Sequence, residues 1–500
     1  MSVLSKDNRH PGNGDLPSAE HDQVERALID ASARRPVMAF YSCAIFWLLL
    51  QSLVSLVTSY KLQAPQFLDG CAFLNYGRLL PLQNNLMVYG WAALAGIGTS
   101  IWILTRLCRV ALPRPGLLLG GLALWNVGLV AGSLEVLSGN GRGFEYLDFP
   151  GYVQALFFIS YSLVAVWGTV VFANRRPGHV YIAAWYIVGA LFWFPWLLGG
   201  ANILLGGSRI QGAMQAVVAA WYAQNIISLW LTAIGLGAIY YLIPKVVGRS
   251  VHSYYLATFG FWTFAIFSVW NGVQRLTGGP VPVWMITVSI VASILLLIPV
   301  ATVTANYFLT MQGDFSLVYH SPTIRFVFFG AIAYTVANLV MVFGSYRSIG
   351  SLTTFSVFST GQDQLFVLAF FSMVMFGSMY YIIPRLVGCE WLSATFIKLH
   401  FWCCAYGFGM SILMMLLAGY AQGAMQAHVN APGMTSPTSD FMLSVYALLP
   451  YLRGRTIALI PLLFGQLIFA LHFFLMVLRL GRPSGVQPTL FAPISEGAKS

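Results

Sequence analysis

Long apolar runs separated by short polar stretches dominate this chain between residues 37 and 481. A helix needs about 20 mostly apolar residues to cross the ~30 Å hydrocarbon layer of a membrane. Twelve runs reach this length, beginning near residues 37, 83, 115, 150, 178, 211, 253, 283, 322, 357, 394 and 452. The pattern therefore predicts an all-α fold, a polytopic membrane bundle of about twelve transmembrane helices. We expect a membrane domain at 37–481, a cytoplasmic disordered tail at 1–36 and a cytoplasmic C-terminal tail at 482–500.

Composition agrees with this prediction and adds an orientation. Only 8% of the 500 residues are charged and 58% are hydrophobic, whereas roughly 25% are charged in an ordinary soluble domain. The net charge is +11, and most Lys and Arg residues fall in the tails and in alternate loops. Because basic residues near span ends stay on the cytoplasmic side, both termini are expected there. The charge favours membrane lipids as partners, and nothing in the chain indicates nucleic acid.

Two segments 140 residues apart share one pattern. Residues 237–248 read Gly-Ala-Ile-Tyr-Tyr-Leu-Ile-Pro-Lys-Val-Val-Gly, and residues 377–388 read Gly-Ser-Met-Tyr-Tyr-Ile-Ile-Pro-Arg-Leu-Val-Gly. Each is expected to close a span at the cytoplasmic interface, where Pro ends the helix and the cation faces anionic headgroups. Two interpretations are open, namely two similar helix ends or an internal structural repeat, and we favour the repeat.

Further motifs occur in a characteristic order. They are Tyr-Gly-Arg-Leu-Leu-Pro-Leu at 76–82, the Tyr-Tyr segment at 240–245, Tyr254 with Phe261 and Trp262, Gly361, the second Tyr-Tyr segment at 380–385, and His-Phe-Trp at 400–402. From about residue 70 to 480 this order resembles subunit I of the cbb3-type cytochrome c oxidases, within the haem-copper oxidase and nitric oxide reductase superfamily. The resemblance implies that superfamily's fold and a bacterial-type inner (cytoplasmic) membrane.

The resemblance also implies six histidine ligands, three to haem iron and three to copper, and none of them is a histidine here. The three haem-ligand positions carry Gln83, Gln362 and Gln364, and the three copper-ligand positions carry Gln224, Gln274 and Arg275. A carboxamide is a poor donor to iron or copper, and a guanidinium stays protonated. We therefore expect degenerate sites, no catalytic residue, no metal, and neither the haem b nor the copper that the family implies.

A second expectation concerns the charges of Arg275 and Asp363, because a charged side chain within a membrane needs a partner. Asp363 is the one acidic residue expected inside the bundle, whereas Glu145 and Asp148 are expected in a loop. We predict that Asp363 or a carbonyl neutralises a buried Arg275. The alternative is that Arg275 extends to the outer interface.

The missing imidazoles favour a non-catalytic homologue of oxidase subunit I. Such a protein would be a structural, regulatory or docking subunit of a respiratory membrane complex, with partners such as a membrane-anchored cytochrome c. Two alternatives stay open. One is an active terminal oxidase or nitric oxide reductase that uses unrecognised ligands for electron transport, oxygen reduction and proton pumping. The other is a transporter on the emptied scaffold, with the five glutamines lining a polar path.

Overall fold

A computed structural model describes residues 19–206, 210–429 and 437–483. Its helices are α1 (Ala19–Lys61), α2 (Tyr76–Asn85), α3 (Ala93–Cys108), α4 (Pro115–Ser138), α5 (Gly151–Ala173), α6 (Ile182–Leu205), α7 (Ala213–Asn225), α8 (Thr232–Val247), α9 (Tyr254–Ser268), α10 (Val283–Leu295), α11 (Leu297–Met311), α12 (Leu317–His320), α13 (Pro322–Ser345), α14 (Arg347–Thr353), α15 (Phe358–Gln364), α16 (Met373–Val387), α17 (Ala394–Val429) and α18 (Pro437–Val477). Two short 3-10 turns, η1 (Ala72–Leu74) and η4 (Val273–Leu276), and the paired strands β1 (Cys389–Glu390) and β2 (Arg482–Pro483) complete it, together with three π-helical segments introduced below.

The predicted all-α membrane bundle is confirmed. Within the described residues, twelve helical stretches are long and apolar enough to cross a membrane. Two boundaries differ from the sequence-based expectation. Helix α1 begins at Ala19, so residues 19–36 are helical rather than a disordered tail. Hydropathy alone favours a loop over 420–450, whereas residues 420–429 and 437–450 form the far ends of α17 and α18.

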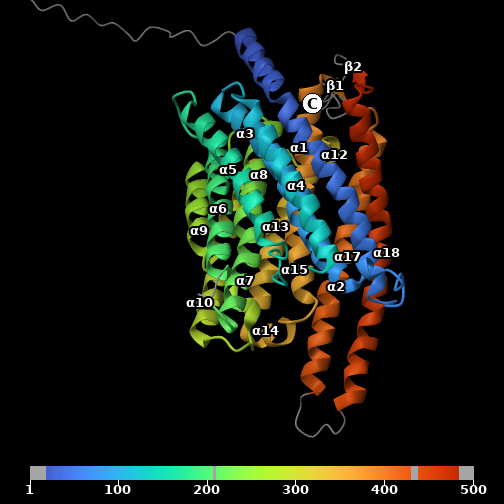
Figure 1. Cartoon of the computed structure of the whole chain (residues 1–500). Coiled ribbons are helices and arrows are strands. Elements are labelled where there is room, and N and C mark those ends of the chain that lie inside the picture. Colours follow the sequence, from blue (N-terminus) through green and yellow to red (C-terminus); the bar gives the residue numbers. More distant parts are fainter. Residues whose placement is uncertain (1–18, 207–209, 430–436, 484–500) are drawn as a thin grey trace, which may run out of the picture.

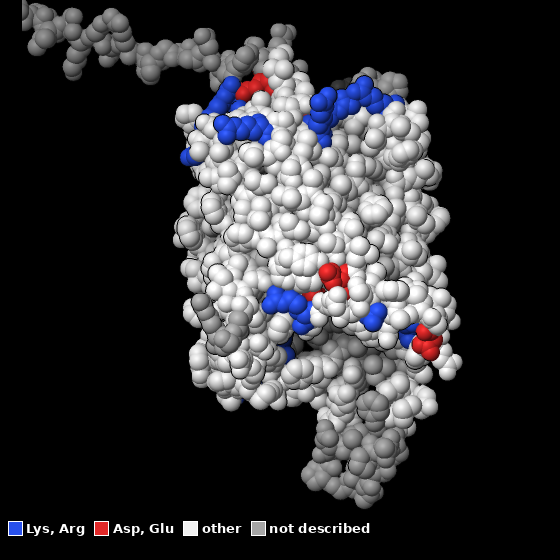
Figure 2. Space-filling view, in the orientation of Figure 1, with Lys and Arg blue, Asp and Glu red and all other residues white. Residues whose placement is uncertain are grey.

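The two faces of the bundle differ in charge. The start of α1 and strand β2 lie at the same end, which we call the terminal face (Figure 1). Lys and Arg side chains gather at this face, above a broad band without charged side chains (Figure 2). A second, mixed layer of acidic and basic side chains lies beyond the band, towards the end that we call the opposite face. The uncharged band is the part of the surface suited to hydrocarbon.

Three spans form the centre of the bundle. They are the second, sixth and tenth (76–108, 213–247 and 358–387), and their most apolar windows are entirely buried, compared with 39–61% for the other nine. Each central span changes from α-helix to π-helix and back. The π-helical segments are η2 (Leu86–Ala92), η3 (Ile226–Leu231) and η5 (Leu365–Ser372). Wide turns of this kind are rare and often mark functional sites.

Hydroxyl side chains stabilise two of these wide turns. Thr232 donates a hydrogen bond to the carbonyl of Ile227 at 2.9 Å, and Ser372 donates one to the carbonyl of Val367 at 2.7 Å. Trp91 of η2 in turn donates from Nε1 to the Ser372 hydroxyl at 2.7 Å. The irregular segments are therefore held by hydrogen bonds that need no ligand.

The two sequence segments that share a pattern also share a helix ending. Helix α8 ends at Gly248 (φ 80°) and α16 ends at Gly388 (φ 77°), both in the left-handed conformation that favours glycine. Each glycine N–H bonds the preceding proline carbonyl, of Pro244 or Pro384, at 2.9 Å. The same spacing of 140 residues (388 − 248) relates Gln224 to Gln364 (364 − 224). This shared ending supports the internal repeat.

Candidate functional site

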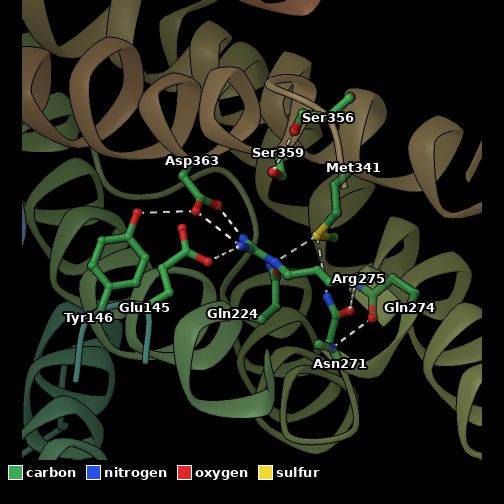
Figure 3. A network of polar contacts seen from close by, with 11 residues as sticks. Glu145, Tyr146, Gln224, Asn271, Gln274, Arg275, Met341, Ser356, Ser359 and Asp363 are labelled. Atoms are coloured by element: carbon green, nitrogen blue, oxygen red, sulfur yellow. Dashed lines mark hydrogen bonds and ion pairs between the residues drawn. The ribbon is translucent and has the colours of Figure 1, made fainter. Parts of the chain in front are cut away.

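Five of the seven predicted site residues lie at the ends of the central helices nearest the opposite face. Gln83 is in α2 and Gln224 in α7, each just ahead of a π-helical segment. Gln362, Asp363 and Gln364 are in α15, directly ahead of η5. The remaining two, Gln274 and Arg275, are in η4, the short turn that follows α9. The structure brings Gln224, Gln274, Arg275 and Asp363 into one polar network (Figure 3).

Arg275 is the centre of this network. Its Nη1 donates to Asp363 Oδ2 at 3.0 Å, and its Nη2 bonds Asp363 Oδ1, so the pair is bidentate. Its Nε donates to Gln224 Oε1 at 2.8 Å, and Glu145 Oε2 lies 3.5 Å from Nη1. The Arg275 side chain is 13% exposed and that of Asp363 is 3% exposed. Arg275 is therefore held inside the protein and satisfied there, and it does not extend to the outer interface.

The backbone of one glycine allows η4 to approach α7 closely enough for this contact. Gly272 has φ 126°, a conformation that other residues rarely adopt. A Cβ atom at Gly272 would lie 2.8 Å from the Cα of Trp221 and 2.9 Å from the carbonyl oxygen of Ala220. Any side chain there would force η4 away from α7, and the bond between Arg275 and Gln224 would be lost.

A loop between α4 and α5 supplies residues that sequence reasoning did not place in the bundle. Tyr146 and Asp148 are buried, and the Tyr146 hydroxyl donates to Asp363 Oδ2 at 3.1 Å. Asn85 Nδ2 donates to Asp148 Oδ2 at 2.7 Å. Hydropathy marks this segment as a loop, and the loop folds inward onto the ends of the central helices. The alternation of acidic and aromatic residues at 144–149 was the available signal, because a fully solvated loop rarely needs so many rings.

The site holds more acidic than basic groups. Arg275 carries one positive charge, whereas Asp363 and Glu145 can each carry a negative one. Although the side chain of Glu145 faces a cavity, desolvation by the surrounding protein and then repulsion from Asp363 raise its pKa to about 7, and the Arg275 guanidinium only partly opposes this. Burial also raises the pKa of Asp148 to about 6, although its bond from Asn85 acts in the opposite direction. Glu145 is therefore the group whose charge changes near neutral pH.

Gln274 belongs to a second part of the network, on the side of Arg275 away from Asp363. Its Oε1 accepts from the Gly272 N–H at 2.7 Å and from the Ser289 hydroxyl, and its Nε2 donates to Asn271 Oδ1. The Nε2 of Gln224 and the Nδ2 of Asn271 both contact the Met341 sulfur, at 3.4 and 3.3 Å. These amides are used as hydrogen-bonding groups within the protein.

Gln83 is the exception among the predicted residues. Its side chain is fully buried, yet neither its Nε2 nor its Oε1 has a hydrogen-bond partner within the described structure. Gln364 is also buried, at 3% exposure, and Gln362 is half-buried. Among the described residues no hydrogen bond joins one predicted glutamine to another. The polar network is therefore centred on Arg275, and the glutamines do not form a chain of mutual hydrogen bonds.

A cavity of about 490 Å³ lies beside the network, towards the opposite face. Its polar lining includes Glu145, Gln215, Gln274, Arg275, Ser359 and Gln362. Glu145 is 42% exposed, and this exposed surface faces the cavity. Through this cavity a small molecule can reach the charged network.

The donor set does not fit a haem iron or a copper ion. The predicted ligand positions offer carboxamides and one guanidinium, and Arg275 brings a fixed positive charge held by Asp363. Within residues 19–206, 210–429 and 437–483, no group of three or more His, Cys, Asp and Glu side chains could hold a metal ion. Buried rings pack between the central helices, as where the ring centroids of Trp91 in η2 and Phe376 in α16 lie 4.9 Å apart. No catalytic step through a haem or a metal follows from these residues.

The architecture defines the class of protein first. Twelve spans around three buried central helices match the solved structure of a heme-copper terminal oxidase dimer, with a TM-score of 0.65 and 12% sequence identity, over 95% of this chain and 87% of the other. The fold is therefore that of a haem-copper oxidase. Residues 35–483 match the family model of cytochrome c and quinol oxidase polypeptide I, and the chain belongs to that family.

Individual relatives agree with this assignment. The chain is 28% identical to a cytochrome c oxidase subunit 1 homolog of Agrobacterium tumefaciens, over 89% of this chain and 83% of that protein. It is 27% identical to cytochrome c oxidase subunit 1 of Rhodobacter capsulatus, over 86% and 83% of the two chains. It is also 27% identical to the cbb3-type cytochrome c oxidase subunit CcoN1 of Stutzerimonas stutzeri, over 79% and 85%. The chain is thus a multi-span membrane protein homologous to bacterial oxidases and to their subunit I.

The unpartnered amide of Gln83 gives the first prediction. A buried polar group without a partner destabilises a protein by about 1–3 kcal/mol, so Gln83→Leu is expected to raise the thermal unfolding midpoint in detergent. Gln154→Leu is the matched control, because buried Gln154 donates to the carbonyls of Leu147 and Phe149 and accepts from Asn202. The control is expected to lower the midpoint. A loss of stability in Gln83→Leu as large as that in Gln154→Leu would show that Gln83 has a partner in the folded protein.

The ion pair gives the second prediction. Arg275→Gln leaves Asp363 and Glu145 facing one another without a counter-charge, and it is expected to lower the free energy of unfolding by about 3–5 kcal/mol. Adding Asp363→Asn in the same chain should recover most of this loss, and a double-mutant cycle measures the recovery. Arg249→Gln is the control, because Arg249 is 56% exposed and pairs with Asp314 at the surface, where about 0–1 kcal/mol is expected. Equal losses in Arg275→Gln and Arg249→Gln would contradict a buried pair.

The carboxyl group of Glu145 gives the third prediction. Its pKa of about 7 in the folded protein lies above the ~4.3 of an unfolded chain, so the folded state binds more protons between these values. Stability is therefore expected to fall as pH rises from about 4.5 to 7 and to level off above 7. Glu145→Gln should remove the part of the fall between pH 6 and 7, which Asp148 does not supply. Unfolding midpoints measured across this range test the slope, with Asp69→Asn at the exposed Asp69 as control, and an unchanged slope in Glu145→Gln would refute the assignment.

Proposed function

We propose that this chain is a non-catalytic, cbb3-related member of the oxidase subunit I family that serves as a structural, regulatory or docking subunit of a respiratory membrane complex. The observation that carries the proposal is the bidentate pairing of Arg275 with Asp363. By the motif resemblance, Arg275 stands where the family has a copper ligand. A protonated guanidinium bound to a carboxylate has no lone pair to offer a metal and repels a cation.

The other five positions support the same reading. Gln224 and Gln274 are engaged with Arg275, Ser289 and Asn271, so their amides already have partners. Gln83, Gln362 and Gln364 stand where the resemblance has haem ligands, and a neutral amide is a weak donor to iron. The fold persists because aromatic packing and hydrogen bonds between the central helices, such as Tyr89 to Tyr222 at 2.7 Å, do not depend on a cofactor.

The docking part of the proposal draws on the last two helices. Helix α17 has 36 residues and α18 has 41, and a helix of 36 residues is ~54 Å long, well beyond the ~30 Å of hydrocarbon. Their far ends project past the bundle at the opposite face (Figure 1). Exposed apolar side chains there include Tyr420, Met425, Met442, Leu443 and Tyr446. An apolar hairpin outside the membrane suits contact with another subunit, and we propose a membrane-anchored cytochrome c as that partner.

The proposed setting is a bacterial-type inner membrane with the terminal face in the cytoplasm. The gathering of Lys and Arg at that face supports this orientation (Figure 2). The homologues are named as oxidase subunits of bacteria. A transporter is the weaker candidate, because the cavity beside Arg275 touches only Gln274 and Gln362 among the five glutamines.

An absorption spectrum with metal analysis tests the proposal. The chain is purified in detergent from cells that make haem, and it is expected to show no haem absorption, a blank pyridine haemochrome assay, and iron and copper far below one atom per chain. The oxidase subunit of Stutzerimonas stutzeri, expressed and purified in the same way, is the positive control. A haem b signal near one per chain would overturn the non-catalytic reading and favour an oxidase or nitric oxide reductase with other ligands.

A further inference from the structure

The three central helices also converge at the terminal face, far from the Arg275 network. Each ends with an aromatic residue followed four positions later by a cation, and the three pairs are Trp102 with Arg106, Tyr241 with Lys245, and Tyr381 with Arg385. The Trp102 ring lies 5.6 Å from that of Tyr241 and 6.0 Å from that of Tyr381. The ends of the three central helices therefore place three cations around one aromatic cluster, at helix C-termini where positive charge is favourable.

Helix α1 passes over this cluster and closes it on one side. Asp30 of α1 accepts from Trp102 Nε1 at 2.9 Å and lies 3.4 Å from Arg106 Nη1. A cavity of about 710 Å³ opens between α1 and the ends of α3 and α16. Its charged lining consists of Arg26, Asp30, Arg34, Arg35, Arg106 and Arg385.

Positive charge in this cavity exceeds what its neighbours neutralise. Arg26 pairs with Asp22 at 2.5 Å, and Arg106 pairs with Asp30. Among the described side chains, no carboxylate lies within 4.0 Å of the three remaining arginines, Arg34, Arg35 and Arg385. Glu390 acts on Arg385 only from beyond that distance.

An adjacent cavity of about 360 Å³ provides a contrast. It shares Arg26 and Arg106 with the larger one, but its lining also contains Asp22 and Glu25. These carboxylates lie 3.5 and 4.0 Å from Arg109, so this arginine is ion-paired. The smaller cavity also contains Lys245 and Arg249, so its five cations face two carboxylates, whereas five cations face one carboxylate in the larger cavity.

We propose that the cavity lined by Arg34, Arg35 and Arg385 binds the phosphate of an anionic lipid headgroup. Guanidinium groups bind phosphate oxygens in a bidentate manner, and several of them converge here. The choice of a lipid over a soluble phosphate rests on position. Leu386 and Val387 line the same cavity. Lys and Arg side chains of the terminal face border the uncharged band (Figure 2), where acyl chains of a bound lipid can follow the protein surface. This site is independent of the proposed function.

Binding of short-chain lipids to the whole chain in a neutral detergent tests the proposal. Phosphatidylglycerol is titrated and its apparent Kd is measured from the shift of the thermal unfolding midpoint. Each arginine near an anionic headgroup is expected to contribute about fivefold in affinity, so Arg35→Gln should weaken binding about fivefold and Arg34→Gln with Arg35→Gln about 25-fold. Arg109→Gln removes one charge from the same face, but from an arginine that lines the other cavity and already has carboxylate partners, and it should leave the Kd unchanged. The midpoint without lipid, which should be unaltered in all variants, verifies that they fold.

Two comparison ligands show whether the bound phosphate belongs to an anionic lipid headgroup or to a soluble phosphate. Phosphatidylcholine, which has no net charge, and inorganic phosphate at the same concentration are expected to shift the midpoint little. An equal shift with phosphatidylcholine, or equal weakening by Arg35→Gln and Arg109→Gln, would overturn the site. A shift with inorganic phosphate as large as that with phosphatidylglycerol would overturn the assignment to a lipid.

Discussion

A guanidinium enclosed by membrane-spanning helices must find its counter-charges within the protein, and the opposite half of this structure is arranged around that constraint. Asp363 supplies two bonds to Arg275, and Gln224 supplies a third from another central helix. The loop between α4 and α5 then folds inward, so that Tyr146 can bond the same carboxylate. Leaving any of these charged groups alone in a poorly solvated site would be costly, and their mutual satisfaction fixes how three helices and a loop meet.

The centre of this oxidase-like scaffold is held by contacts between its own side chains. Ion pairing, hydrogen bonds and ring packing position the central helices. Trp91 and Ser372 join η2 to η5, and Tyr89 and Tyr222 join η2 to α7. The folded arrangement of the family is thus compatible with very different chemistry at its centre, which is why fold alone does not establish an activity.

The sequence predicted the bundle, its twelve spans and the residues around Arg275 because hydropathy and motif order depend on local composition. The sequence-based prediction was wrong where tertiary contacts override the local hydropathy. Asp148 reads as a loop residue, yet it is buried because Asn85 offers it a bond. Residues 420–429 and 437–450 have the composition of a polar loop, yet they extend α17 and α18, because packing against a neighbouring helix stabilises a weak helix former. Glu145 could not be located in advance, because its environment is created by residues from three distant segments.

The π-helical segments have a geometric consequence for how the sequence of this protein can evolve. A wide turn holds about one residue more than an α-helical turn, and one residue corresponds to ~100° of rotation about the helix axis. Losing that extra residue would keep Gln83, Gln224 and Gln364 facing their present neighbours while swinging the Arg106, Lys245 and Arg385 ends about their axes. The segments thereby separate each central helix into two halves whose angular phases are set independently, so the two faces of the bundle can diversify without disturbing one another.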